Sequence, residues 1–159
     1  MSRLTFFVDL DGTLKTEAGA KGPFEVNSLN VEVGMNKFEV GIRPHIHEFL
    51  QCAKSKGKVI LSTASGRRYA RKMLTAMGIS NYFDEIVTAE VFARGISNYP
   101  NCVFIDNDGE SGELKMSKMA SSMGRTVKRN DLWIIDTFDG DQKDTTMLEL
   151  IDEIKNIDA

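Results

Sequence analysis

The chain has 159 residues, of which 42% are hydrophobic and 27% are charged, and its formal net charge is −3. This size and composition are typical of one domain with a hydrophobic core, so we expect residues 1–159 to form a single domain and a monomer. The net charge gives no general electrostatic footprint for nucleic acid, although it does not exclude that partner. No apolar run is long enough to span a membrane and the amino terminus has no apolar h-region, so we expect a cytoplasmic protein without a membrane partner. Cys52 and Cys102 lack metal-ligand spacing, which predicts reduced thiols.

The first informative stretch is a strand that ends in two carboxylates. Residues 4–8 have the β-branched and aromatic content of a buried strand, and residues 9–14 read Asp-Leu-Asp-Gly-Thr-Leu. By chance, Asp-x-Asp-Gly-Thr is expected in roughly one chain per thousand of this length. Because open α/β sheets bind ligands at the carboxyl ends of their strands, Asp9 and Asp11 are predicted to face such a crevice.

The next segment predicts a loop and a β-hairpin. Residues 15–24 lack periodicity, which is typical of an exposed loop, whereas residues 29–33 and 38–42 alternate apolar and polar around a turn at 34–36. The hairpin either flanks the mouth of the site or merely extends a sheet. Arg43 and Pro44 then open a helix that ends at Gly57.

A second strand runs into hydroxyl side chains. Residues 58–61 are mostly apolar, and Ser62-Thr63-Ala64-Ser65 follows just before a predicted helix at 67–77. Hydroxyls and free N–H groups at such a junction bind phosphate, although alone they more often form a plain helix cap. The basic start of that helix is either a solvated face or a site for extra phosphates on a polyanionic substrate.

A third strand, residues 102–105, ends in Asp106-Asn107-Asp108-Gly109. Further on, methionines at helical spacing around 116–123 predict a core-filling helix, residues 132–135 a last strand, and Asp144 the cap of a carboxyl-terminal helix. Strands that alternate with helices predict a doubly wound α/β fold with a mainly parallel sheet.

The segment 9–14 resembles the first motif of the haloacid dehalogenase (HAD) superfamily. Thr63-Ala64-Ser65 with Tyr69-Ala70, and residues 38–50, are similar to the polymerase-tail phosphatase (FCP/SCP, or NIF-type) branch of that superfamily. The resemblance implies a HAD-like, Rossmannoid three-layer α/β sandwich with a mainly parallel sheet. It also implies a loop and hairpin insertion at 15–42 after the first motif, and no separate cap domain.

The same resemblance implies a Mg²⁺-dependent phosphatase that hydrolyses a phosphomonoester through an aspartyl-phosphate. Asp9 would be the nucleophile, Asp11 the general acid and base, and Thr63 the phosphate ligand, with Ser65 or Ser62 as alternatives. The implied substrate-binding residues are Gly12, Thr13, Thr63, Ala64 and Ser65. The implied metal ligands are Asp9, Asp11, Asp106 and Asn107. An uncapped site would admit a macromolecular phosphorylated substrate. The alternative is a catalytically impaired module that binds phosphorylated partners.

One expected element is missing from its usual place. Phosphoryl transfer needs a fixed cation near the equatorial oxygens, and relatives supply it from the segment before the Asp106 strand. Residues 87–102 contain no lysine and only Arg94, which we rank first as a catalytic residue. The other sources are Lys72 or Arg67 from the helix after the second motif, and Lys115 or Lys118 from beyond Asp106.

Overall fold

The computed structural model describes residues 4–94, 99, 101–123 and 129–157. Its centre is a five-stranded parallel sheet with the order β5-β4-β1-β6-β7. The strands are β1 (Leu4–Val8), β4 (Gly57–Thr63), β5 (Glu85–Thr88), β6 (Asn101–Asp106) and β7 (Arg129–Ile134). Because β1 lies in the middle and is buried along its whole length, both faces of the sheet must be covered.

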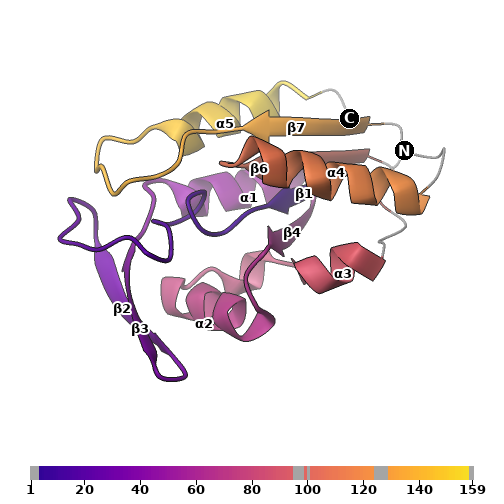
Figure 1. Cartoon of the computed structure of the whole chain (residues 1–159). Helices are drawn as coiled ribbons and strands as arrows, with labels where there is room; N and C mark the ends of the chain where they lie inside the picture. The colour runs from indigo at the N-terminus through magenta and orange to yellow at the C-terminus, as the bar shows by residue number, and fades with distance from the viewer. Residues whose placement is uncertain (1–3, 95–98, 100, 124–128, 158–159) are drawn as a thin grey trace.

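Helices cover the sheet on both faces and complete three layers (Figure 1). One face packs against α1 (Ile46–Lys56), α2 (Arg67–Met77) and α5 (Thr146–Lys155). The other face packs against α3 (Ala89–Arg94) and α4 (Gly109–Met123). A short 3₁₀ turn, η1 (Ser80–Tyr82), follows α2. The predicted mixed α/β class with a parallel sheet is confirmed.

Strand alternation decides which helix layer meets the functional end of β1. Phe6 and Val8 belong to the core beneath α1, α2 and α5, whereas Phe7 stacks on Phe104 at 4.7 Å in the core beneath α3 and α4. Asp9 is two residues beyond Phe7, so its side chain continues toward the α4 face. The fold therefore presents the first acid of the motif to α4.

The predicted hairpin is present as a separate two-stranded sheet, β2 (Ser28–Val33) and β3 (Asn36–Gly41). It projects from the main sheet beside α2 (Figure 1), and Phe38 of β3 packs edge-on against Tyr69 of α2 at 5.1 Å. Its apolar positions Val31 and Val40 are buried. The hairpin thus joins the core through α2 instead of extending the main sheet.

The prediction that residues 15–24 form an exposed loop is wrong at its start. Lys15 and Thr16 are 1% and 0% exposed, because Lys15 forms an ion pair with Asp11 and donates a hydrogen bond of 2.7 Å to the Thr16 carbonyl. A buried lysine needs such partners to offset its desolvation. Periodicity could not reveal this burial, since the partner lies in the preceding motif.

The predicted end of the first helix at Gly57 is confirmed, whereas its start differs, because α1 begins at Ile46, after Pro44 and His45. Gly57 begins β4 as well as following α1, and a Cβ there would lie 1.9 Å from the Leu4 carbonyl oxygen. Thr145 is the residue directly before α5, but Asp144 still contributes to the helix start, since its Oδ1 accepts the Thr146 N–H at 3.1 Å. The same carboxylate binds Arg43 through both oxygens. The cysteines are free, as predicted, and burial raises the pKa of Cys102 to about 12. In the part of the chain that the structure describes, no helix has the length and apolarity needed to cross a membrane.

Candidate active site

Asp9 and Asp106 meet at the carboxyl ends of two neighbouring strands. The register of β1 and β6 pairs Val8 with Ile105, and the Asp9 N–H donates to the Ile105 carbonyl at 3.0 Å. Both aspartates continue the strand positions that face α4. The sheet therefore places two carboxylates side by side on one face, where they repel unless a cation lies between them.

Lys115 of α4 supplies that cation. Its Nζ lies 2.8 Å from Asp106 Oδ2 and 3.4 Å from Asp9 Oδ1, and it donates to the Ser62 carbonyl at 2.9 Å. The lysine is only 7% exposed. A Cβ at Gly112 would lie 2.5 Å from Leu132 Cδ1, which shows how closely the preceding turn of α4 packs on β7. Close packing of this helix brings the ammonium group into the site.

Asp9 is an acid in an environment that opposes its charge. Burial raises the pKa of Asp9 to about 7, and nearby Asp106 adds to the rise, while Lys115 and a 3.2 Å hydrogen bond from Thr13 Oγ1 oppose it. Burial is the larger effect because water is largely excluded from the strand end. Additional positive charge beside Asp9 would favour the ionised carboxylate.

Oxygen atoms converge on the other side of Asp9. One end of the Asn107 side-chain amide lies 2.8 Å from Asp9 Oδ2, 3.1 Å from the Asp11 carbonyl oxygen and 3.2 Å from Thr13 Oγ1. If the amide nitrogen occupies that end, it donates to these oxygens. If the amide oxygen occupies it, several oxygens meet and a cation is needed between them.

This donor set fits a magnesium ion. Magnesium usually takes one or two carboxylates from the protein and keeps several waters. With its amide oxygen turned toward Asp9, Asn107 would join Asp9 Oδ2 and the Asp11 carbonyl oxygen as three hard ligands of that kind, although the described residues contain no group of three His, Cys, Asp or Glu side chains that could hold a metal. Asp106 is not part of this set, because its carboxylate accepts from Lys115 and from the Asp108 N–H.

The Asp11 side chain has a separate environment. Its Oδ1 accepts from Tyr69 Oη at 2.7 Å and forms the ion pair with Lys15, and its Oδ2 accepts from Ser65 Oγ at 3.0 Å. Burial and the Asp11 carboxylate raise the pKa of Tyr69, whereas burial lowers the pKa of Lys15 despite the charge of Asp11. These contacts hold the Asp11 side chain, whereas its carbonyl oxygen lies in the oxygen cluster with Asn107.

The second motif lies next to Asp11. Thr63 is 2% exposed, and its Oγ1 accepts the Ser65 N–H at 3.0 Å. Ala64 is exposed and Ser65 is half-buried, and the latter binds Asp11 as described above. Thr63 has a hydroxyl hydrogen still to donate, so the junction of β4 and α2 keeps polar groups available to a ligand.

A buried arginine holds the first motif in place. Arg43 is 1% exposed, pairs with Asp144 at 2.9 and 3.0 Å, and donates to the Thr13 carbonyl at 3.1 Å and the Asp136 carbonyl at 3.0 Å. Gly12 has φ +81°, and a Cβ there would lie 2.4 Å from Asn107 Nδ2. The loop of the first motif thus depends on Arg43, for which the sequence predicted only a place at the start of a helix.

The predicted cations have different positions in the structure. Arg94 ends α3, but its side chain lies outside the described residues, as does that of Lys118, so the first-ranked assignment stays a prediction. Arg67 and Lys72 are exposed on α2, and neither forms an ion pair with a described residue. Lys115 is the candidate that contacts the carboxylates. Extending the methionine stripe of α4 back by one turn would have placed Lys115 near the buried face.

Comparisons with known proteins agree with this geometry. The family model "NLI interacting factor-like phosphatase" matches residues 4–159, and the chain belongs to that family. This finding confirms the predicted relation to the polymerase-tail phosphatase branch of the HAD superfamily. No curated protein matches the chain.

Two solved structures share the fold. The structure of Fcp1, described as an essential RNA polymerase II CTD phosphatase, aligns with a TM-score of 0.59 and 16% identity, over 96% of this chain and 49% of that one. The fission yeast Fcp1-R271A variant bound to beryllium fluoride aligns with a TM-score of 0.54 and 17% identity, over 96% and 51% of the respective chains. The chain therefore spans about half the length of these proteins.

The environment of Asp9 predicts a stability change. Its pKa is raised when folded, so the neutral acid stabilises the fold below about pH 4 and this contribution is lost as the pH rises through 7. In EDTA at pH 8, Asp9→Asn should raise the free energy of unfolding by about 2 kcal/mol, and the gain should shrink toward pH 4. Urea unfolding across this range measures it.

Asp152→Asn, an exposed change on α5, is the matched control and should show no such trend. A loss of stability in Asp9→Asn at pH 8 would contradict the description of Asp9 as a buried acid under repulsion.

Proposed function

We propose that this chain is a magnesium-dependent phosphatase that hydrolyses a phosphomonoester through an aspartyl-phosphate on Asp9. The observation that carries the proposal is the buried ammonium group of Lys115, which lies between Asp9 and Asp106 at the open end of the sheet. Such a fixed positive charge stabilises the negative charge that spreads over a phosphoryl group during transfer. Membership in a phosphatase family supports the same conclusion.

Asp9 is the nucleophile in this proposal. Its Oδ2 belongs to the oxygen cluster with Asn107, which leaves Oδ1, the atom near Lys115, to attack phosphorus. The new bond joins Oδ1 to phosphorus while the bond from phosphorus to the leaving oxygen breaks. Water then attacks phosphorus, inorganic phosphate leaves, and the carboxylate is regenerated.

Asp11 transfers the protons in both steps. In the first step its carboxyl gives a proton to the leaving oxygen, and in the second it takes one from the attacking water. Tyr69, Ser65 and Lys15 fix the orientation of this carboxyl through the contacts given above. Tyr69 and Ser65 come from α2 and the loop before it, so the second motif positions the acid of the first.

The phosphate would be bound at the end of β4. Thr63 would donate its hydroxyl, and exposed Ala64 leaves the backbone of the junction accessible to the phosphate. The metal ligands would be Asp9 Oδ2, the Asp11 carbonyl oxygen and Asn107 Oδ1. A magnesium ion bound there supplies positive charge that offsets repulsion between the Asp9 carboxylate and the phosphate.

We further propose that the phosphate is carried by a protein segment. The solved structures that share this fold are described as CTD phosphatases, and the insertion after the first motif is a hairpin beside α2 and not a domain over the site. An open site admits a loop or a tail of a macromolecule.

One contact favours the alternative, a module that binds phosphorylated partners without turning them over. The ion pair with Lys15 occupies Asp11 Oδ1, which also accepts from Tyr69 Oη, and a carboxyl group held in this way is less free to reach the leaving oxygen. Turnover of an aryl phosphate by the wild-type protein separates the two functions, since the binding module would retain affinity without product.

The position of the Lys115 ammonium group leads to a kinetic prediction. Lys115→Met keeps the length and apolar stem of the side chain but removes its charge, so kcat with magnesium and an aryl phosphate should fall by roughly a hundredfold or more. Arg94→Met, Lys72→Met and Lys118→Met should each stay within a few-fold of wild type, with circular dichroism confirming the fold. A wild-type kcat in Lys115→Met together with a large loss of kcat in Arg94→Met would assign the catalytic cation to Arg94 and not to Lys115.

Tyr69 makes a second kinetic prediction, through its hydrogen bond to Asp11. A poor alkyl leaving group needs the proton from Asp11, whereas a nitrophenolate leaves without it. Tyr69→Phe should therefore lower kcat about tenfold for an alkyl phosphate but only slightly for p-nitrophenyl phosphate. Tyr82→Phe, which removes a hydroxyl that contacts exposed His47, is the control. Equal losses on both substrates would show that Tyr69 acts on folding or binding and not on Asp11.

A further inference from the structure

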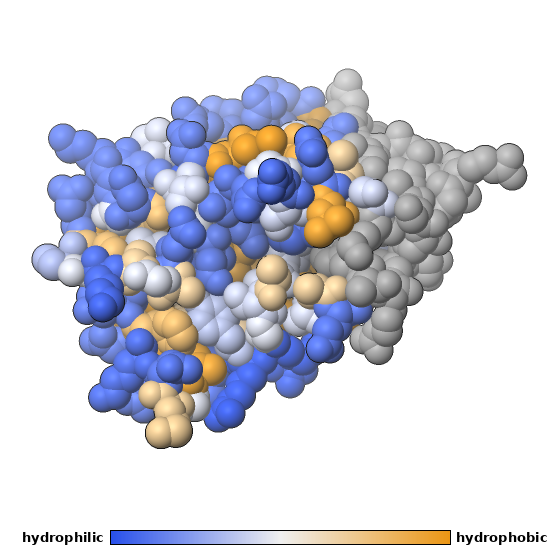
Figure 2. Space-filling model, in the orientation of Figure 1, coloured by the Kyte–Doolittle hydropathy of each residue, from blue (hydrophilic) through white to orange (hydrophobic). Residues whose placement is uncertain are grey.

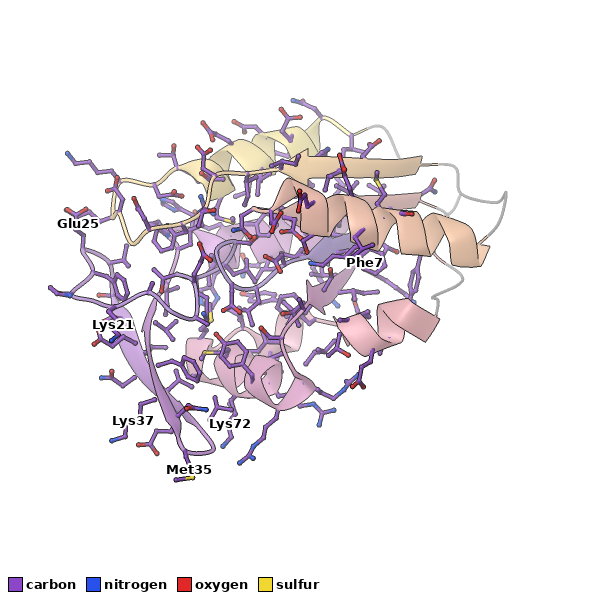
Figure 3. All side chains as sticks on the ribbon, viewed as in Figure 1. Phe7, Lys21, Glu25, Met35, Lys37 and Lys72 are labelled. Carbon is purple, nitrogen blue, oxygen red and sulfur yellow. The ribbon has the colours of Figure 1, made fainter. Side chains whose placement is uncertain are left out.

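A groove separates α2 from the hairpin and has a volume of about 860 Å³. We name it the α2 groove. Its polar lining comes from Arg67, Arg68, Arg71 and Lys72 on the helix and from Asn30 and Glu32 on β2. Figure 3 shows Lys72 on α2 beside the hairpin, whose turn carries Met35, and Figure 2 shows hydrophilic side chains over this part of the molecule.

The four cations of the α2 groove are concentrated and unpaired. They occupy six consecutive positions, which cover about 7.5 Å of helix axis. Arg67 with Arg71, and Arg68 with Lys72, each stand one turn apart, so they form two adjacent rows. None of them forms an ion pair with another described residue. Four positive charges this close repel one another, and an anionic ligand would relieve that repulsion.

The α2 groove lies next to the junction of β4 and α2, which borders the candidate active site. Arg67 lines both this groove and a smaller hollow of about 240 Å³ that is formed by residues on either side of Ser65. Ser65 in turn donates to Asp11. At the far end, a Cβ on Gly34 would lie 3.9 Å from Arg68 Nη1, so the arginine reaches the hairpin turn. A chain that leaves the active site past Ser65 therefore enters the row of cations.

The shape of the α2 groove fits an extended peptide. β2 pairs with β3 alone among the described strands, so its second edge has backbone groups that a peptide strand can bind. No aromatic side chain is among the described residues that line the groove, so it offers no platform for stacking bases. The net charge of −3 also argues against general binding of nucleic acid.

We propose that the α2 groove binds an acidic extension of a phosphorylated peptide substrate, either a second phosphoserine or a run of carboxylates. This inference rests on the proposed function and adds a substrate class to it. Seven positions separate Ser65 from Lys72, which is about 10 Å of helix axis, and an extended peptide covers that distance in about three residues. Because the scissile phosphoserine would lie beyond Ser65, an acidic group about four positions from it reaches the cations. Arginine forks bind phosphate and carboxylate in two-pronged fashion, so both sources of negative charge suit the groove.

The test compares matched peptides on wild type and on Arg68→Gln/Arg71→Gln, with exposed Lys155→Gln as the control variant. Each peptide carries the phosphoserine that is to be hydrolysed. Four positions away, on either side, it carries a second phosphoserine, three aspartates or neutral residues. Wild type should show a kcat/KM about tenfold higher for the acidic peptides, mainly through KM, and this preference should fade with added salt. The double variant should lose the preference while keeping its rate on p-nitrophenyl phosphate.

A binding measurement separates this proposal from the proposed function. Fluorescence anisotropy of the labelled peptides on Asp9→Asn needs no turnover, and the acidic peptides should bind about tenfold more weakly when Arg68 and Arg71 are also replaced. Equal affinity for acidic and neutral peptides would overturn the groove assignment even if catalysis is confirmed. Tighter binding of a 5′-phosphorylated oligonucleotide, lost in the same variants, would overturn the peptide assignment. If the protein discriminates among the peptides but turns over no aryl phosphate, only the proposed phosphatase activity is overturned.

Discussion

The interaction on which the site depends is the buried contact of Lys115 with Asp9 and Asp106. Parallel strand register brings the two carboxylates together at the end of β1 and β6, where they repel each other unless a cation lies nearby. α4 provides the cation because it packs closely on β7 at Gly112, one turn before Lys115. The ammonium group satisfies Asp106 and leaves Asp9 partly uncompensated, with a pKa of about 7. Asp9 is therefore a buried carboxyl group whose charge is only partly compensated, which is the state that we propose for the nucleophile.

The second acid is held by a different part of the chain. Asp11 is oriented by Lys15, Ser65 and Tyr69, while Arg43 fixes the backbone of the same loop to the segments after β7. Tyr69 also packs against Phe38, so the hairpin is connected to Asp11 through one side chain. Asp9 and Asp11 are only two residues apart, but different residues contact their carboxylates. They can therefore perform the different tasks that we propose for them. The same connection places the hairpin beside both Tyr69, which contacts Asp11, and the α2 groove, where we propose that the peptide binds.

Strong local patterns predicted the fold and part of the site. The apolar runs before Asp9, Thr63 and Asp106 were sufficient to predict three parallel strands whose ends meet, and alternation around 34–36 predicted the hairpin. Burial of Lys15 and Arg43 could not be predicted in this way, because each is stabilised by a partner that only the tertiary structure brings near. Arg94 was ranked first from its sequence interval, and that ranking stays a prediction because its side chain lies outside the described residues. The contact of Lys115 with Asp9 and Asp106 depends on how α4 packs. The hydrophobic stripe of α4 contained the relevant information, but its methionines were interpreted as core alone.

The central claim is that Asp9 forms a covalent bond to phosphorus beside Lys115. The most direct measurement mixes the protein and magnesium with a phosphopeptide that carries radioactive phosphate, quenches the reaction with acid within milliseconds, and maps the label by proteolysis and mass spectrometry. The proposed mechanism predicts label on Asp9 that hydroxylamine removes, and more of it in Asp11→Asn, where the water lacks its base. Turnover without any label on Asp9 in either protein, or label on another residue, would contradict the claim.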